Sequence, residues 1–137
     1  MCSSIMYFYK GHTIKTDFSN PDALLPVRTK SGEFKLLTWG RRQDQLGQLP
    51  LGGWARLDAI KSGKWDQYFP KPVQLPIKQF MEVDIENKSH WYPITEGQWI
   101  QGVLAREKGE RRIYIVTIMP EGIHAIHERW PRIMVGS

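Results

Sequence analysis

The chain has 137 residues, a mass of 16.0 kDa and a net charge of +5, which fit one compact domain and are too small for two ordinary ones. Apolar residues make up 41% of the chain and aromatic residues 12%, which indicates a folded protein. No stretch approaches 18 apolar residues, and the first residues lack the pattern of a signal peptide, so we expect neither a membrane span nor secretion. One cysteine excludes an internal disulfide and a cysteine-rich zinc site, and we expect a cytoplasmic monomer.

Nine prolines and 12 glycines divide the sequence into short pieces, which favours strands over long helices. Strands are predicted where aromatic and β-branched residues gather, and helices only where one or two turns fit between breakers. In chain order we expect a strand at Ile5–Tyr9, a strand at Phe34–Trp39, a polar surface loop at Gly40–Gly47, helices at Leu57–Lys61 and Lys64–Phe69, strands at Gln79–Ile85, Ser89–Ile94, Trp99–Ala105 and Arg112–Met119, and a helix at Glu121–His127.

Two segments predict hairpin turns between the later strands. Glu86-Asn87-Lys88 is one, and Arg106–Arg111, in which Gly109 can adopt a positive φ, is the other. The pattern predicts an α+β fold that is mainly β. We expect a single domain over residues 1–137, with a curved, partly closed antiparallel sheet and a few short helices.

Cys2 follows the initiator methionine. Methionine aminopeptidase generally trims an initiator before a small residue, so we expect Cys2 to carry a free α-amine beside its thiol. With ordinary pKa values of about 8 for the amine and about 8.5 for the thiol, modest local shifts make either group nucleophilic near neutral pH. An aldehyde suits this pair, because the amine forms an imine and the thiolate then closes a thiazolidine ring. The alternative is a small residue on a frayed terminus.

Two other residues are candidates for proton transfer. His127 can donate or accept a proton near pH 7, but it can equally be a structural histidine, or ligate a metal with His124, although no third ligand lies at a recognisable spacing. Glu82 shares a strand face with Phe80, and burial of that face would raise the pKa of the carboxyl group. The sequence favours the other orientation, with Glu82 in solvent.

The six tryptophans and the excess of cations allow two interpretations. Such rings often form the core, but beside lysines and arginines they can stack unpaired bases while the cations hold phosphates. Spacing does not distinguish these cases. Serine-protease, phosphate-loop and dinucleotide-binding signatures are absent, and we expect neither a cofactor nor a metal.

Several short motifs follow one another in an informative order. They are Cys2, Ala55-Arg56, Leu75-Pro76 with Phe80-Met81-Glu82, Gln101-Gly102-Val103-Leu104, and His127-x-Arg129-Trp130-Pro131. In this order the chain resembles the SRAP family, the SOS-response-associated peptidases. Members of that family begin with Met-Cys-Gly-Arg, carry Asn-Ala-Arg, Leu-Val-Pro, Gly-Phe-Tyr-Glu-Trp and Phe-Ala-Gly-Leu-Trp-like segments, and close with His-x-Arg-Met-Pro. The resemblance runs through nearly the whole chain.

This resemblance implies a DNA-damage protein that binds single-stranded DNA and links covalently to abasic sites as a thiazolidine. Cys2 would be the nucleophile. Glu82 would move protons on and off the Cys2 amine, and His127 would donate the proton that opens the closed abasic sugar. The same groups can run these steps backwards, so the resemblance also implies slow release of the crosslink.

The chain departs from the family in its expected contacts with DNA. Two family arginines are missing, one after the cysteine and one before the Leu-Val-Pro segment. We expect Arg56, Lys71 and Arg129 to hold phosphates in their place, and Trp54 or Trp130 to stack bases.

Two functions from other classes stay open. A cysteine peptidase or amidase would use the same terminal nucleophile on a peptide bond, and it predicts turnover of peptides. A nonreactive module for single-stranded nucleic acid would bind with salt-sensitive affinity whether or not Cys2 and an abasic site are present.

Overall fold

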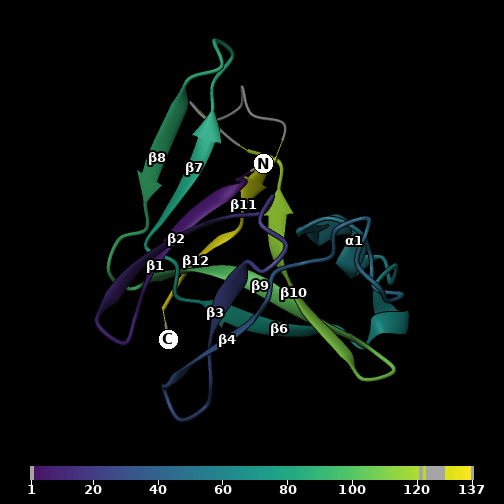
Figure 1. Cartoon of the computed structure of the whole chain (residues 1–137). Coiled ribbons are helices and arrows are strands. Elements are labelled where there is room, and N and C mark those ends of the chain that lie inside the picture. The colour runs from purple at the N-terminus through teal and green to yellow at the C-terminus, as the bar shows by residue number, and fades with distance from the viewer. Residues whose placement is uncertain (1, 121, 123–128, 137) are drawn as a thin grey trace.

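The structure, a computed structural model, describes residues 2–120, 122 and 129–136 (Figure 1). Strands make up 52% and helices 7% of it, which confirms a mainly β fold with a few short helices. Each of the six predicted strands is present. The elements in chain order are β1 (Ser4–Tyr9), β2 (His12–Asp17), β3 (Leu24–Arg28), β4 (Phe34–Thr38), β5 (Trp54–Arg56), α1 (Leu57–Lys61), the 3-10 helix η1 (Asp66–Tyr68), β6 (Lys71–Leu75), β7 (Gln79–Val83), β8 (Ser89–Pro93), β9 (Gln98–Glu107), β10 (Glu110–Ile118), β11 (Trp130–Pro131) and β12 (Ile133–Val135).

The strands form three sheets that curl into a half-barrel, which confirms the expected curved, partly closed architecture. The first sheet has the order β2-β1-β7-β8. The second has the order β11-β10-β9-β12, with β6 antiparallel to β9 and β5 parallel to β10, so this sheet is mixed rather than purely antiparallel. The β3–β4 hairpin is the third sheet, and a bridge between Trp39 and Ile113 connects its end to β10.

Tight turns join the antiparallel neighbours. Lys10 and Gly11 connect β1 to β2 with φ values of 47° and 81°, and Lys108 and Gly109 connect β9 to β10 with φ values of 44° and 86°. Two positive φ values in succession match the right-handed twist of the flanking strands, and glycine at the second position makes them accessible. The positive φ predicted for Gly109 is confirmed, but the predicted turn Arg106–Arg111 is too long because both strands continue into it.

Six strands were not predicted from the sequence: β2, β3, β5, β6, β11 and β12. Three of them contain proline, Pro26 in β3, Pro72 in β6 and Pro131 in β11, and proline suggested a break. Among the described residues, β3 pairs with β4 alone, β6 with β9 alone and β11 with β10 alone, so all three are edge strands. An edge strand has one side without ladder hydrogen bonds, and proline is tolerated there.

The helical predictions have three different outcomes. The helix at Leu57–Lys61 is confirmed as α1. The one predicted at Lys64–Phe69 shrinks to η1 and ends at Phe69, which has a left-handed backbone. The helix predicted at Glu121–His127 lies outside the described residues except for Gly122.

Two hydrophobic clusters lie on opposite faces of the second sheet. Alternate residues of β10 divide between them: Ile113 and Ile115 face the inside of the half-barrel, while Tyr114 and Val116 face α1. The inner cluster is the larger and also contains residues of β1, β3, β6 and β7. Cys2 belongs to this inner cluster, so the core of the half-barrel reaches the start of the chain.

Candidate active site

Cys2 lies just before β1 and is fully buried. Its backbone carbonyl accepts a hydrogen bond of 2.9 Å from the indole N–H of Trp54, which lies in β5. This contact joins the start of the chain to the second sheet, 52 positions further on. The interpretation of Cys2 as a small residue on a frayed terminus is therefore not supported.

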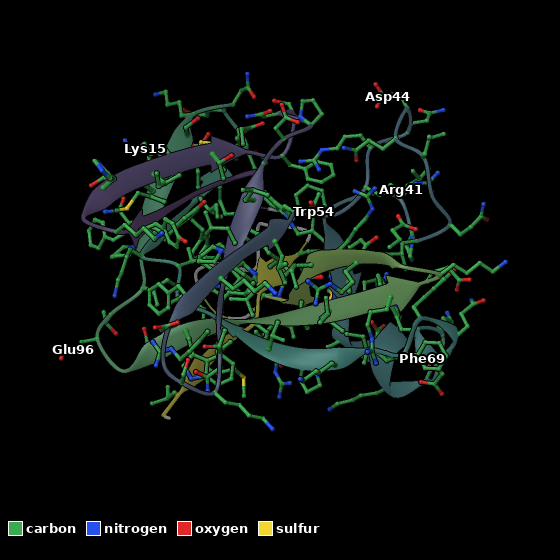
Figure 2. The ribbon with its side chains drawn as sticks, turned by 60° about the horizontal axis from the view of Figure 1, so that its bottom comes forward. Lys15, Arg41, Asp44, Trp54, Phe69 and Glu96 are labelled. Carbon is green, nitrogen blue, oxygen red and sulfur yellow. The ribbon has the colours of Figure 1, made fainter. Side chains whose placement is uncertain are left out.

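An aromatic cluster holds the Trp54 ring in place. Its centroid lies 4.9 Å from that of Phe18 and 6.0 Å from that of Trp39, and the two neighbouring rings are 5.4 Å apart. The indole N–H of Trp39 donates to the carbonyl of Gly53 at 2.9 Å, directly before Trp54. Trp54 is partly buried and lies nearer the middle of the view in Figure 2, whereas the exposed Asp44 lies at its margin. Rigid neighbours of this kind hold the indole N–H directed at Cys2.

Strand pairing brings Glu82 into the same region. In the β1–β7 ladder Ser4 lies opposite Met81 and Ile5 opposite Phe80, so continuing the register by one position places the start of the chain beside Glu82. The Glu82 side chain is 2% exposed. Its negative charge raises the pKa of the Cys2 thiol, as expected for two groups that are near one another.

The burial of Glu82 contradicts the orientation that the sequence favoured. Phe80 and Glu82 face the core, while Ile85 at the end of this segment is 86% exposed. The ring of Phe80 stacks on Tyr92 at 5.5 Å and meets Trp130 edge-on at 5.0 Å. Phe80 therefore faces inward, because the rings of Tyr92 and Trp130 form an aromatic surface against which it packs. Glu82 lies two positions further along β7, on the same face, so it faces inward as well.

Both titratable groups have shifted pKa values. Burial raises the pKa of the Cys2 thiol to about 12, and the charge of Glu82 raises it as well, while a contact with Trp54 acts in the opposite direction. Burial is also the main cause that raises the pKa of Glu82. Near neutral pH the thiol is thus protonated, and the carboxyl group exchanges its proton closer to neutral pH than an ordinary glutamate does.

The closing motif is only partly described. His127, the third predicted catalytic residue, lies outside the described residues. Arg129 and Trp130 are 7% and 8% exposed. Arg129 donates to the carbonyl and hydroxyl oxygens of Thr117 at 2.7 Å and 3.2 Å, and Trp130 packs against Phe80. The structure places both side chains inside the domain, where they fix β11 against β10.

The other two predicted phosphate contacts lie on the surface. Arg56 forms a two-pronged ion pair with Asp58, with Nε–Oδ1 and Nη2–Oδ2 distances of 3.1 Å and 2.9 Å. This pair holds the pKa of Asp58 below its ordinary value. Lys71 is exposed at the start of β6, where it lines a groove beside the β3–β4 hairpin.

Sequence reasoning missed the segment that supports the start of the chain from the other side. The backbone N–H of Phe18 donates to the carbonyl of Ser3 at 2.8 Å, and the Ser4 hydroxyl donates to Asp17. Phe18 also packs on Trp54. No motif marks these residues, because their role arises from the β1–β2 pairing, and β2 is too polar to be recognised as a strand.

In the part of the chain that the structure describes, no three histidine, cysteine or acidic side chains are grouped as metal ligands. Within that same part, no helix has the length and apolar character needed to cross a membrane. No protein-family model matches the chain, and no curated protein or solved structure matches it either.

Proposed function

We propose that the chain, once Met1 is removed, captures abasic sites in single-stranded DNA by forming a thiazolidine at Cys2. One observation carries the proposal. A nucleophilic residue and a carboxyl group that stand 80 positions apart in the sequence lie within one buried region, and both have raised pKa values. The order of motifs that resembles the SRAP family supports the same reaction, and the net charge of +5 suits an anionic strand.

The reaction needs no oxidant or reductant. The α-amine of Cys2 attacks the aldehyde carbon of the ring-opened abasic sugar, and loss of one water gives an imine. The thiol sulfur then bonds to the imine carbon, the π electrons of the C=N bond move to nitrogen, and nitrogen takes up the proton that the thiol releases. The adduct therefore has the mass of protein plus DNA less one water.

The surroundings of Cys2 suit this order of steps. A thiol with a raised pKa stays protonated, so the amine adds to the aldehyde first. Glu82 takes the proton that the amine loses and returns it to the hydroxyl group that leaves as water, a task helped by its raised pKa. Trp54 holds the Cys2 carbonyl and with it the position of the amine. The opening of the sugar is assigned to His127 by the resemblance alone.

The test mixes Met1-trimmed protein with single-stranded DNA that carries one abasic site. A denaturing gel and intact mass are expected to show an adduct of protein plus DNA less water. Cys2→Ala should abolish this adduct. Cys2→Ala and Cys2→Ser both keep the α-amine but lack the thiol, so with either variant an adduct should survive denaturation only after borohydride reduces the imine.

Glu82→Gln tests the proton carrier separately. Its amide fills nearly the same space but takes up no proton, so the adduct should form more slowly, with a mass that is still that of the variant plus DNA less one water. Absence of any adduct from trimmed, folded protein would refute the proposal. If the protein turns over peptides and forms no adduct, the cysteine peptidase is favoured. If it does neither, the nonreactive binding module is the remaining function.

A further inference from the structure

A second feature of the molecule is a groove of about 930 Å³ between the β3–β4 hairpin and the strands β6, β9 and β12. In Figure 1 the turn of the β3–β4 hairpin lies at the bottom of the view and β6 lies below β9, whereas the start of the chain lies in the upper half. The groove is therefore separate from the region around Cys2. Its size falls in the range of roughly 300–1,000 Å³ that is typical of ligand-binding clefts.

The groove is lined by a concentration of positive charge. Six of the 19 lysines and arginines of the chain line it, and its lining contains no aspartate or glutamate. Among the residues that the structure describes, none of the six forms an ion pair. Cations without carboxylate partners in a concave surface raise the local potential and attract anions. The six are Arg28, Lys30, Lys35, Lys71, Arg111 and Arg132.

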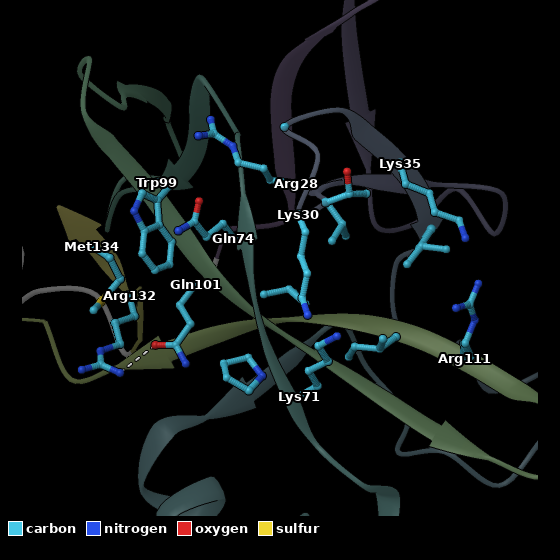
Figure 3. A pocket seen from close by; sticks show the side chains of 17 residues that line it. Arg28, Lys30, Lys35, Lys71, Gln74, Trp99, Gln101, Arg111, Arg132 and Met134 are labelled. Carbon is cyan, nitrogen blue, oxygen red and sulfur yellow. Dashed lines mark hydrogen bonds between the residues drawn. The ribbon is translucent and has the colours of Figure 1, made fainter. Parts of the chain in front are cut away.

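The cations form a row and do not converge on one point. In Figure 3, Arg132 lies at one end of the groove, Lys35 and Arg111 lie at the other, and Lys30 and Lys71 lie between them, while Arg28 lies above this row on the side of Trp99. A pocket for a single phosphate would direct its cations at one centre. A row of point charges fits a chain of phosphates, and lysine suits phosphates that are held without a fixed geometry.

The end with Arg132 also offers groups that fit nucleobases. Trp99 is partly exposed there, and its indole N–H donates to the carbonyl of Gly136 at 2.8 Å, which fixes the ring. Gln74 and Gln101 add amide groups to the same end, and Gln101 accepts a hydrogen bond of 2.6 Å from Arg132 (Figure 3). A held aromatic ring beside amides and cations is typical of sites that stack an unpaired base.

We propose that this groove binds a segment of single-stranded nucleic acid without covalent chemistry, with phosphates along the row of cations and a base against Trp99. The inference goes beyond the capture of abasic sites, because the groove shares no residue with the region around Cys2 and needs no aldehyde. It assigns a nucleic-acid contact to strands in which the sequence analysis found only Lys71.

The test uses undamaged oligonucleotides, which carry no aldehyde for Cys2 and therefore separate this proposal from the crosslinking reaction. Fluorescence anisotropy is measured with a labelled twelve-nucleotide oligothymidylate between 50 and 200 mM salt. The groove variant combines Lys30→Gln, Lys35→Gln and Lys71→Gln, three exposed substitutions that leave the core untouched. If all three hold phosphates, the slope of log affinity against log salt should fall in magnitude by about 2.

The matched control carries the same loss of three charges at exposed lysines outside the groove, Lys10→Gln, Lys61→Gln and Lys78→Gln. It should keep the wild-type slope. A slope difference of about 2 means that the wild-type protein loses roughly 16-fold more affinity than the groove variant over this range of salt. Trp99→Ala should weaken binding severalfold with the slope unchanged, because stacking involves no counterions.

Three outcomes would overturn the proposal. The first is that the wild-type protein shows no salt-dependent binding. The second is that the groove variant and the control lose the same amount of slope, and the third is that a doubly phosphorylated peptide binds more tightly than the oligonucleotide. Parallel measurements with DNA and RNA of the same sequence identify the sugar that the groove accepts. Duplex DNA should bind more weakly, since its bases are not free to stack on Trp99.

Discussion

The buried thiol of Cys2 gives a quantitative prediction. Raising the pKa of the Cys2 thiol from 9.0 to about 12 lowers the thiolate fraction near neutral pH by about a thousandfold, which corresponds to about 4 kcal/mol for ionising Cys2 in the folded chain. Thiolate is the form that reacts with alkylating reagents. Native protein that keeps Met1 should therefore react with iodoacetamide at least about a thousand times more slowly than the denatured chain.

The assay follows alkylation by intact mass at pH 7.5, in buffer and in denaturant. Cys2 is the one cysteine of the sequence, so every alkylation event reports on it. The neighbours provide the internal check. Glu82→Gln removes the negative charge that raises the pKa and should speed native labelling, whereas Trp54→Phe removes the contact that lowers it and should slow labelling. A native rate within tenfold of the denatured rate would refute the reasoning.

Three further predictions concern stability. Glu82 has a raised pKa in the folded chain, so its favourable contribution is complete below its ordinary pKa of 4.5 and is lost as the pH rises through the folded value. Glu82→Gln should thus raise the free energy of unfolding in urea at pH 7 more than at pH 4. An equal change in the free energy of unfolding at the two pH values would contradict this prediction. Gly53→Ala would place a Cβ 2.7 Å from the rings of Phe18 and Trp39, and it should lower the free energy of unfolding by about 1–3 kcal/mol; an unchanged melting temperature would count against the tight packing. Phe69 is 65% exposed with φ at 50°, so Phe69→Gly should be neutral or stabilise by up to about 1 kcal/mol in the same urea assay, and a clear loss would show that the ring has a packing role.

Local residue types determined a substantial part of the fold. Runs of aromatic and β-branched residues placed six strands, and the helix Leu57–Lys61 and the positive φ of Gly109 followed from propensity and turn chemistry. These features depend on residues close together in the chain, and so they are accessible to sequence reasoning. The polar strand β2 and the proline-containing strands β3, β6 and β11 were missed, because their stability comes from partner strands and not from their own composition.

The candidate site shows where local information ends. Alternation put Phe80 and Glu82 on one face, but it carries no information on which face is inside. The rings of Tyr92 and Trp130 decide that, and they come from distant parts of the chain. The burial of Glu82, and with it the direction of its pKa shift, is therefore a property of the tertiary structure.

The same division applies to the two sites as a whole. The sequence by itself determined that the one cysteine stands at position 2, directly after Met1, and that cations exceed acids. Only the tertiary structure decided that Glu82 lies near that thiol, and that Lys30, Lys71 and Arg111 line one groove. The physical reason is that strand pairing joins residues far apart in sequence. Dielectric surroundings and electrostatic potential depend on the neighbours in space that this pairing supplies.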